Sequence, residues 1–362
     1  MENKTARIDS LQALRALAFI GIFLVHAKIA WGWSRLGVSI FFCMSGFLMT
    51  YIYWDRQLPG NIVDALRFSL GKIKKLYPLH IITMIAVVLI ELWIYRTNGV
   101  LREAIFGLLR NIALNIFLVQ SWYPDSTVNV ALNGVAWYLS VALFLYIKFP
   151  FLLKWMKKRK LPVLVFTAIL LIALQIILAY PFALRYGAEG VRYRWFMYCF
   201  PAYRVVDFFC GCVLGRIYML TSEKENTDNT IVYTILEICL LAFSIWFSLW
   251  LGAVEESPVM LAIKNWSSGY IVMALPWIWV FAMKKGLLTK LISNPAMIAL
   301  GNISPQAFLI HYVIVRFVNA YMGLHQIPFT TLRTWELFVL EFIVTILACV
   351  IYLRIKKSRL FS

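Results

Sequence analysis

Two side chains able to do chemistry, Arg15 and His26, occupy one apolar run near the start of the chain, RALAFIGIFLVH. If this run is an α-helix, eleven residues turn it through about 1,100°, so both side chains lie on one face, about 16 Å apart along the axis. Ionisable groups are costly in an apolar span and mark a functional pathway by default. A guanidinium suits a phosphate, and an imidazole suits proton abstraction from a hydroxyl.

The separation of about 16 Å along a helix is comparable to an extended pantetheine arm between a coenzyme A phosphate and its thioester. Arg15 would then hold donor phosphates near one membrane surface, while His26, deep in the helix, would act on an acceptor hydroxyl. Simpler interpretations exist for both residues. Arg15 lies near a helix end, where arginine commonly snorkels, and a lone histidine is often a packing residue.

The composition predicts that this pair belongs to an integral membrane protein. Of 362 residues, 62% are hydrophobic and only 14% are charged, which is more apolar surface than a water-soluble core of this size can bury. The formal net charge is +18, but the cations lie in short clusters between apolar runs. That distribution is typical of cytoplasmic loops and argues against a nucleic-acid partner.

Apolar runs of about 20 residues predict about ten transmembrane helices, and hence an all-α polytopic protein with a single domain over residues 1–362. No internal repeat is visible, and the loops are too short for an appended soluble domain. The ten predicted helices are Leu11 to Ala30, Leu36 to Trp54, Leu76 to Tyr95, Val135 to Trp155, Leu161 to Tyr180, Pro201 to Leu220, Ile231 to Leu251, Ser268 to Met283, Asn302 to Tyr321 and Trp335 to Leu353.

A short apolar run from Ala104 to Val119 decides the orientation of everything after it. If it does not cross the membrane, the basic clusters, including KWMKKRK at 154–160, all fall on one side. If it crosses, that cluster is exported. The positive-inside rule favours the first arrangement, with both termini cytoplasmic and His26 further toward the outside than Arg15.

Three more residues are candidates for the site. Lys72 and Lys75 belong to a basic cluster that is either a plain positive-inside anchor or a second set of phosphate contacts beside Arg15. Asp207 follows Arg204 by three residues, so the two can form a structural pair within one helix. The alternative is that Asp207 orients the imidazole of His26.

Other polar and small residues are given structural roles. Gly211 and Gly215 have the spacing that lets transmembrane helices approach closely, and Ser39, Ser45 and Gly46 suit packing between helices. The pair Trp137 and Tyr138 suits an interfacial aromatic belt. His311 lies in the middle of the predicted helix from Asn302 to Tyr321 and is not selected as a site residue. Four glutamates are also not selected, because they are expected to be exposed near helix ends: Glu91, Glu237, Glu336 and Glu341. The six cysteines have no spacing typical of a disulfide framework or a zinc site, so they are expected to be buried, and no metal is expected.

These residues resemble the acyltransferase-3 family of integral membrane acyltransferases. The family's motif of Arg, ten residues and His is Arg15 to His26, and GVSIFFCMSGFL (37–48) is similar to its Gly-Val-x-x-Phe-Phe-x-x-Ser-Gly-Phe block. KIKKLYP (72–78) resembles the family's basic run ending in Pro, and WYLSVALFLYIKFP (137–150) and LGNISPQAFLIHY (300–312) match two later blocks more weakly. Two features depart from the pattern: Ala142 stands where the family usually has Glu, and lysines replace the usual arginines at Lys72 and Lys75.

The resemblance implies a multi-pass enzyme of the bacterial plasma (inner) membrane. It would move an acyl group, most simply acetyl from cytoplasmic acetyl-CoA or another acyl-CoA, to a hydroxyl of a cell-surface or lipid-linked saccharide. Arg15, Lys72 and Lys75 would bind the donor, His26 would be a general base or a transient acyl carrier, and Asp207 would orient His26. The expected partners are membrane lipids, the acyl-CoA and the saccharide acceptor.

Two other functions fit the same residues. A transporter or flippase of a lipid-linked sugar or anionic metabolite would use Arg15 to bind a diphosphate and His26 to move protons, although the inverted repeats common in such proteins are not seen. A membrane scaffold would use the charged pairs for structure alone.

Overall fold

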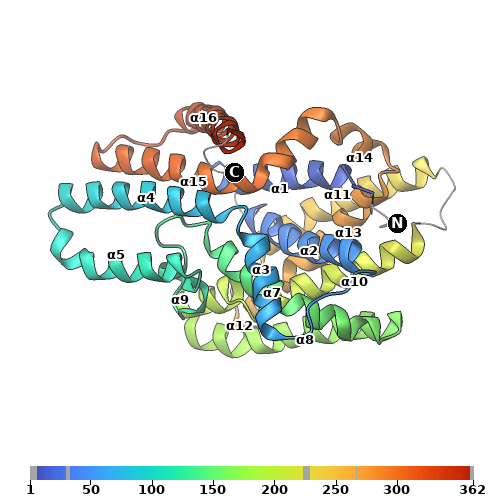
Figure 1. Cartoon of the computed structure of the whole chain (residues 1–362). Coiled ribbons are helices and arrows are strands. Elements are labelled where there is room, and N and C mark those ends of the chain that lie inside the picture. Colours follow the sequence, from blue (N-terminus) through green and yellow to red (C-terminus); the bar gives the residue numbers. More distant parts are fainter. Residues whose placement is uncertain (1–5, 30–32, 223–228, 266, 359–362) are drawn as a thin grey trace.

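The structure is a computed structural model that describes residues 6–29, 33–222, 229–265 and 267–358, and the described part contains helices and no strand. An α-helix occupies each of the ten predicted segments (Figure 1). These helices are α1 (Ser10–His26), α2 (Trp33–Tyr53), α4 (Tyr77–Thr97), α7 (Trp137–Lys157), α8 (Leu161–Tyr186), α10 (Val205–Thr221), α11 (Thr230–Ala253), α13 (Ser268–Met283), α15 (Pro295–Leu324) and α16 (Thr331–Lys357).

Among the residues that the structure describes, eight helical spans are long and apolar enough to cross a membrane. They comprise α2, α4, α7, α8, α11, α15, α16 and the span 258–283, which contains α13. The other two predicted crossings, α1 and α10, have 17 residues each, or about 26 Å of helix, against a hydrocarbon core about 30 Å thick. The structure thus has the character of a multi-pass membrane protein, and a count of ten crossings stays a prediction.

The first helix is shorter than its sequence pattern predicts. Leu11 to Ala30 was expected, but α1 ends at His26, and position 30 lies outside the described residues. The expectation that His26 lies deep within the helix is therefore wrong, because His26 is its last residue. At this position the imidazole is half-buried.

The centre of the bundle is the contact between α2 and α10, and small residues on both helices make it close. A Cβ added to Gly46 would lie 2.0 Å from the carbonyl oxygen of Phe208, and one added to Gly211 would lie 1.8 Å from that of Cys43. Gly215 meets the backbone of Phe47 in the same way. The predicted packing role of these glycines is confirmed, since any side chain there would force the two backbones apart.

Around this centre lie helices whose outer faces are strongly apolar. Ile177 of α8, Leu249 of α11 and Leu347 of α16 are each more than half exposed, as expected of side chains that meet lipid. Of the six cysteines, five are buried as expected, but Cys239 of α11 is exposed. The short helices that connect the bundle are α3 (Ile62–Ile73), α5 (Leu101–Ile116), η1 (Gln120–Trp122), α6 (Ser126–Asn129), α9 (Val191–Arg194), η2 (Trp195–Cys199), α12 (Pro258–Ile263) and α14 (Leu287–Ile292).

The apolar run from Ala104 to Val119, on which the predicted membrane orientation depends, forms most of α5. Helix α5 folds back along α4. The hydroxyl of Tyr77, at the start of α4, donates to the carbonyl oxygen of Ile116, at the end of α5, at 2.8 Å. The chain then enters α7, whose last residue, Lys157, donates through Nζ to the carbonyl oxygen of Arg56 at 3.3 Å. Since Arg56 follows α2, the basic end of α7 and the end of α2 lie at the same end of the molecule.

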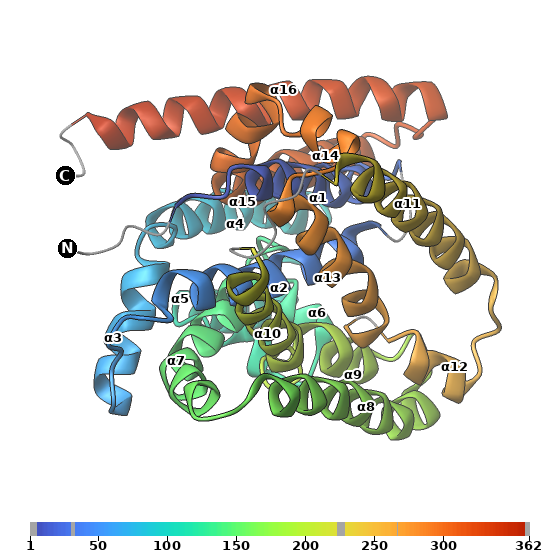
Figure 2. The same cartoon turned by 90° about the vertical axis from the view of Figure 1, so that its right-hand side faces the viewer.

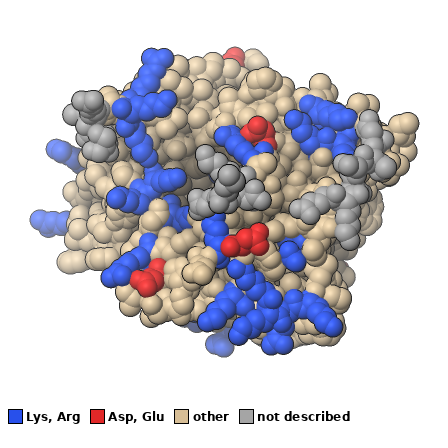
Figure 3. Space-filling model, turned by 45° about the vertical axis from the view of Figure 1, so that its right-hand side comes forward, with Lys and Arg blue, Asp and Glu red and all other residues tan. Residues whose placement is uncertain are grey.

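Several basic segments lie on one face of the molecule. Lys356, near the end of α16, donates through Nζ to the carbonyl oxygen of Lys75 at 3.0 Å, and the start of α1, the helix α3 and the end of α16 lie on the same side of the bundle (Figure 2). We call the face around Lys75, Lys157 and Lys356 the basic face. Lys and Arg side chains surround a hollow on the face shown in Figure 3.

Candidate active site

Two histidines from distant parts of the chain form a hydrogen-bonded pair. Nδ1 of His26, at the end of α1, lies 2.9 Å from Nε2 of His311, in the middle of α15. The two rings are stacked, with centroids 5.2 Å apart and an interplanar angle of 18°. His311 is fully buried, whereas His26 is half-buried. Only His26 can therefore meet a substrate without a rearrangement of the core.

The hydrogen bonds of His311 decide where the protons lie on both rings. Nδ1 of His311 is 3.1 Å from the carbonyl oxygen of Ala307, which only accepts, so Nδ1 carries a hydrogen. Burial disfavours an unpaired charge, and in a neutral imidazole the other nitrogen is then an acceptor. Nδ1 of His26 must therefore donate to His311, which leaves Nε2 of His26 with a lone pair.

Aromatic side chains and a close helix contact hold the pair in place. The rings of Phe19 and Phe23 lie 5.5 Å and 4.9 Å from the ring of His311. Helices α1 and α15 can approach because a Cβ added to Gly301 would lie 1.8 Å from the carbonyl oxygen of Gln12. Such packing fixes the orientation of the imidazoles and keeps water from the buried one.

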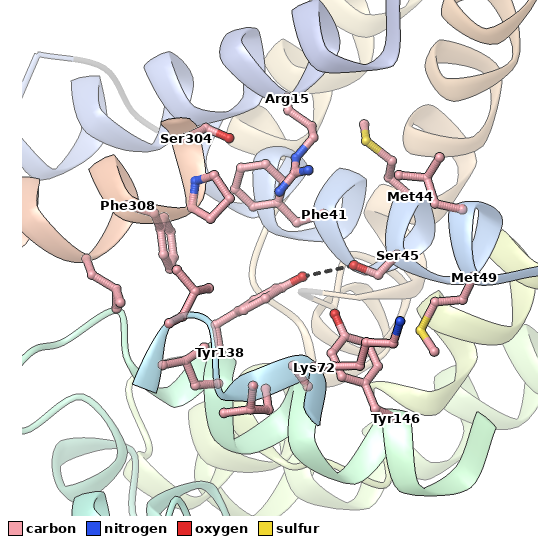
Figure 4. A pocket seen from close by; sticks show the side chains of 17 residues that line it. Arg15, Phe41, Met44, Ser45, Met49, Lys72, Tyr138, Tyr146, Ser304 and Phe308 are labelled. Atoms are coloured by element: carbon pink, nitrogen blue, oxygen red, sulfur yellow. Dashed lines mark hydrogen bonds between the residues drawn. The ribbon is translucent and has the colours of Figure 1, made fainter. Parts of the chain in front are cut away.

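Arg15 and Lys72 line one cavity with a volume of about 250 Å³. Figure 4 shows Arg15 reaching into this cavity from α1, with Lys72 and Tyr146 on the other side of it. Between them, the hydroxyl oxygens of Tyr138 and Ser45 are 3.3 Å apart, within hydrogen-bond range. The remaining lining is largely apolar. The cavity thus offers two cations and four hydroxyl groups within an otherwise largely apolar wall, which suits a flexible arm with a charged end.

Contacts outside the cavity position the two cations. Lys72 donates to the hydroxyl of Tyr53, and its Nζ lies 4.4 Å above the ring of that residue. Arg56 also packs against Tyr53, with its guanidinium carbon 5.3 Å from the ring centroid. Arg15 makes a long hydrogen bond of 3.5 Å to the side chain of Gln12, so its guanidinium keeps donors for a ligand.

The structure separates Lys75 from this cavity. Lys75 is exposed and lines a different groove, together with Lys356. It does not share the cavity lined by Arg15 and Lys72, so its predicted donor contact has no support in this geometry. Ala142, where the resembling family usually has Glu, is buried in the cavity wall.

Asp207 lies in a separate buried network. Its carboxylate accepts hydrogen bonds from Arg204 at 3.1 and 3.3 Å, from Ser39 at 3.0 Å and from Ser267. Asp207 and Arg204 are both fully buried. The structural pair foreseen from the sequence is therefore present, and the partner of His26 is His311. Among the described residues, no contact joins Asp207 to His26 that would support the prediction that Asp207 orients the imidazole.

Several residues differ in burial or in role from what the sequence predicts. His311 was not predicted to be a site residue, although its position in the middle of a predicted membrane helix could have indicated one. Trp137, expected in an interfacial belt, is buried, and Tyr138 lines the cavity. Glu336 is exposed as expected, but three other glutamates expected at exposed helix ends are buried: Glu91, Glu237 and Glu341.

Comparison with known proteins places this arrangement in a family. Residues 8–354 match the family model described as an acyltransferase domain. The chain is 25% identical over 332 residues to the O-acetyltransferase OatA of Staphylococcus aureus strain NCTC 8325, a match that covers 89% of this chain and 53% of that protein. OatA of strains COL and MRSA252 gives the same values, so the chain spans about half the length of these relatives. No solved structure matches. Because the family model covers nearly its whole length, the chain belongs to the acyltransferase-3 family.

Proposed function

We propose that this protein is a membrane O-acyltransferase that moves an acyl group, most simply acetyl from acetyl-CoA, to a hydroxyl of a cell-surface or lipid-linked saccharide. It would lie in the bacterial plasma membrane with its basic face toward the cytoplasm. The family match and the names of the O-acetyltransferase relatives support the reaction class. The choice of acyl-CoA as donor and of a saccharide as acceptor rests on the two cations of the cavity and on the resemblance.

The observation that carries the proposal is the hydrogen bond between Nδ1 of His26 and His311, which leaves a lone pair on Nε2 of His26. That nitrogen is on the half-buried ring, and its tautomer is fixed by the bond to His311. A neutral imidazole with a fixed lone pair is a competent general base or nucleophile near neutral pH. A packing histidine would not need a buried second histidine to orient it.

The reaction balances in either of two ways. In direct transfer, Nε2 of His26 takes the proton of the acceptor hydroxyl, whose oxygen attacks the thioester carbonyl. The carbon–sulfur bond breaks, and the departing thiolate receives the proton. In the two-step route, Nε2 attacks the thioester carbon, the carbon–sulfur bond breaks, and the CoA thiolate leaves. The acceptor oxygen then attacks the acyl carbon, the bond to Nε2 breaks, and the hydroxyl proton passes to the thiolate. Both routes need the same lone pair.

The donor would bind from the basic face. Arg15 and Lys72 supply positive charge for its phosphates. The cavity volume of about 250 Å³ is below the roughly 300–1,000 Å³ of sites that enclose a whole drug-sized ligand. The cavity therefore suits the pantetheine arm and acyl end, while the nucleotide end stays at the surface of the basic face.

The test uses purified protein in proteoliposomes with radiolabelled acetyl-CoA and a glycan extract from the cell envelope of the source cell. Wild type should release CoA and label the glycan, and His26→Ala should lose about 10²–10⁴-fold of that activity while keeping the same elution profile. Loss of label with normal CoA release would point to hydrolysis instead of transfer. A flippase or scaffold would consume no thioester, so wild-type protein that releases no CoA would refute the proposal.

A further inference from the structure

A second, polar groove lies next to the histidine pair, on the side away from the Arg15 cavity. It has a volume of about 230 Å³ and is lined by polar side chains of three helices, chiefly Glu91 and Tyr95 of α4, Asn111 of α5, and Tyr312 and Arg316 of α15. The ring of Tyr312 is 5.4 Å from the ring of His26, edge to face. Tyr312 therefore joins the lining of the groove to the ring of His26, the residue that would carry out the chemistry.

Helix α15 links the two hollows along one ridge. Ser304, Phe308, Tyr312 and Arg316 are spaced four residues apart, so they lie on one helix face. The first two line the Arg15 cavity and the last two line the groove. At 1.5 Å per residue the whole ridge is about 18 Å long. Along the helix axis His311 comes between the two pairs, so the Arg15 cavity and the groove lie to either side of it.

From this geometry we infer that the groove is the acceptor site and that it binds a neutral saccharide unit. The inference rests on the proposed acyltransferase function and adds the place and class of its acceptor. The carboxylate of Glu91 can accept hydrogen bonds from sugar hydroxyls, while the amide of Asn111 can both accept and donate. The face of a tyrosine ring offers an apolar surface for a sugar ring.

The charges in the groove favour a neutral ligand over an acidic one. The guanidinium of Arg316 is already paired with Glu91, at 2.8 Å from Nε and 2.6 Å from Nη2 to the same carboxylate oxygen. An anionic sugar would have to compete with this carboxylate for the arginine and would be repelled by it. A hydroxyl can join the pair without breaking it. The cations of the Arg15 cavity have no such neutralising carboxylate in their lining.

The test is a thiol-protection experiment that does not depend on catalysis. Asn111→Cys is placed in a Cys239→Ser background, which leaves only the five buried cysteines. Spheroplasts of the source cell are treated with a membrane-impermeant maleimide, with and without maltotriose, cellotriose, triacetylchitotriose or the anionic trigalacturonate. The matched control is Glu103→Cys, an exposed position at the start of the same helix α5 and outside the groove lining.

We expect the maleimide to label both cysteines from outside, and at least one neutral trisaccharide near saturation to slow the labelling of Asn111→Cys about tenfold. Trigalacturonate should not slow it, and no sugar should protect Glu103→Cys. Failure of every neutral sugar to protect, equal protection by trigalacturonate, or labelling only after permeabilisation would overturn the inference. Protection by a neutral sugar in a protein that transfers no acetyl group would refute the proposed function and leave the groove as a saccharide-binding site.

Discussion

Nδ1 of His26 lies 2.9 Å from Nε2 of His311, although 285 positions separate the two residues in the chain. His311 is itself held by the carbonyl oxygen of Ala307, one turn earlier in α15. The result is a relay of two hydrogen bonds that begins at the backbone and ends at the free nitrogen of His26. Four experiments test this relay, the two lysines of the basic cluster, the buried pair of Arg204 and Asp207, and the packing of α2 on α10.

The first concerns His311 as a positioning residue. In His311→Gln, the amide oxygen can accept from Nδ1 of His26 and preserve its tautomer, whereas His311→Leu fills space without an acceptor. We expect the leucine variant to lose at least about tenfold in kcat, roughly the value of one hydrogen bond, with KM for acetyl-CoA unchanged. The glutamine variant should recover most of this loss. Equal kcat in the two variants would mean that His311 serves packing alone.

The second experiment separates the two lysines of the basic cluster. Lys72 lines the Arg15 cavity and Lys75 does not. Lys72→Ala should raise KM for acetyl-CoA about tenfold, as expected for loss of a charged hydrogen bond, and Lys75→Ala should raise it less. Steady-state kinetics of CoA release at several donor concentrations provide the measurement. A larger effect at Lys75 would restore the sequence-based prediction for that residue.

The third experiment asks whether Asp207 serves structure or catalysis. Asp207→Asn weakens the partner of a fully buried arginine, and loss of one member of a buried ion pair costs about 3–5 kcal/mol. We expect a lower melting temperature in detergent and a lower yield of folded protein, with near-normal kcat in the fraction that folds. An inactive variant with wild-type stability would instead indicate that Asp207 acts on His26.

The fourth experiment tests the central contact between α2 and α10. In Gly211→Ala, the new methyl group would collide with the carbonyl oxygen of Cys43, and overpacking of this kind costs about 1–3 kcal/mol or more. Gly252→Ala is the matched control, because nothing lies within 4 Å of its Cβ and alanine is the better helix former. Thermal unfolding in detergent should show a lower melting temperature for the first variant only. The same melting temperature in both would contradict the tight contact.

Local patterns in the sequence determined the helices and half of the candidate site. The lengths of the apolar runs predicted helices at all ten positions because an apolar stretch of that length is long enough to cross a bilayer. The spacing of Arg15 and His26 on one helix face follows from helical geometry alone. Likewise, Arg204 and Asp207 could be paired because they are three residues apart.

Only the tertiary structure decided which distant groups meet. Glu91 was expected to be exposed, yet it is buried because Arg316, 225 positions later, neutralises it. Glu237 is buried because it accepts hydrogen bonds from the backbone nitrogens of Leu288 and Thr289 at the start of α14. His311 becomes a candidate site residue because the packing of α15 on α1 brings it next to His26. A single sequence shows that such a polar group exists, but burial is tolerable only beside a partner, and the fold alone supplies that partner.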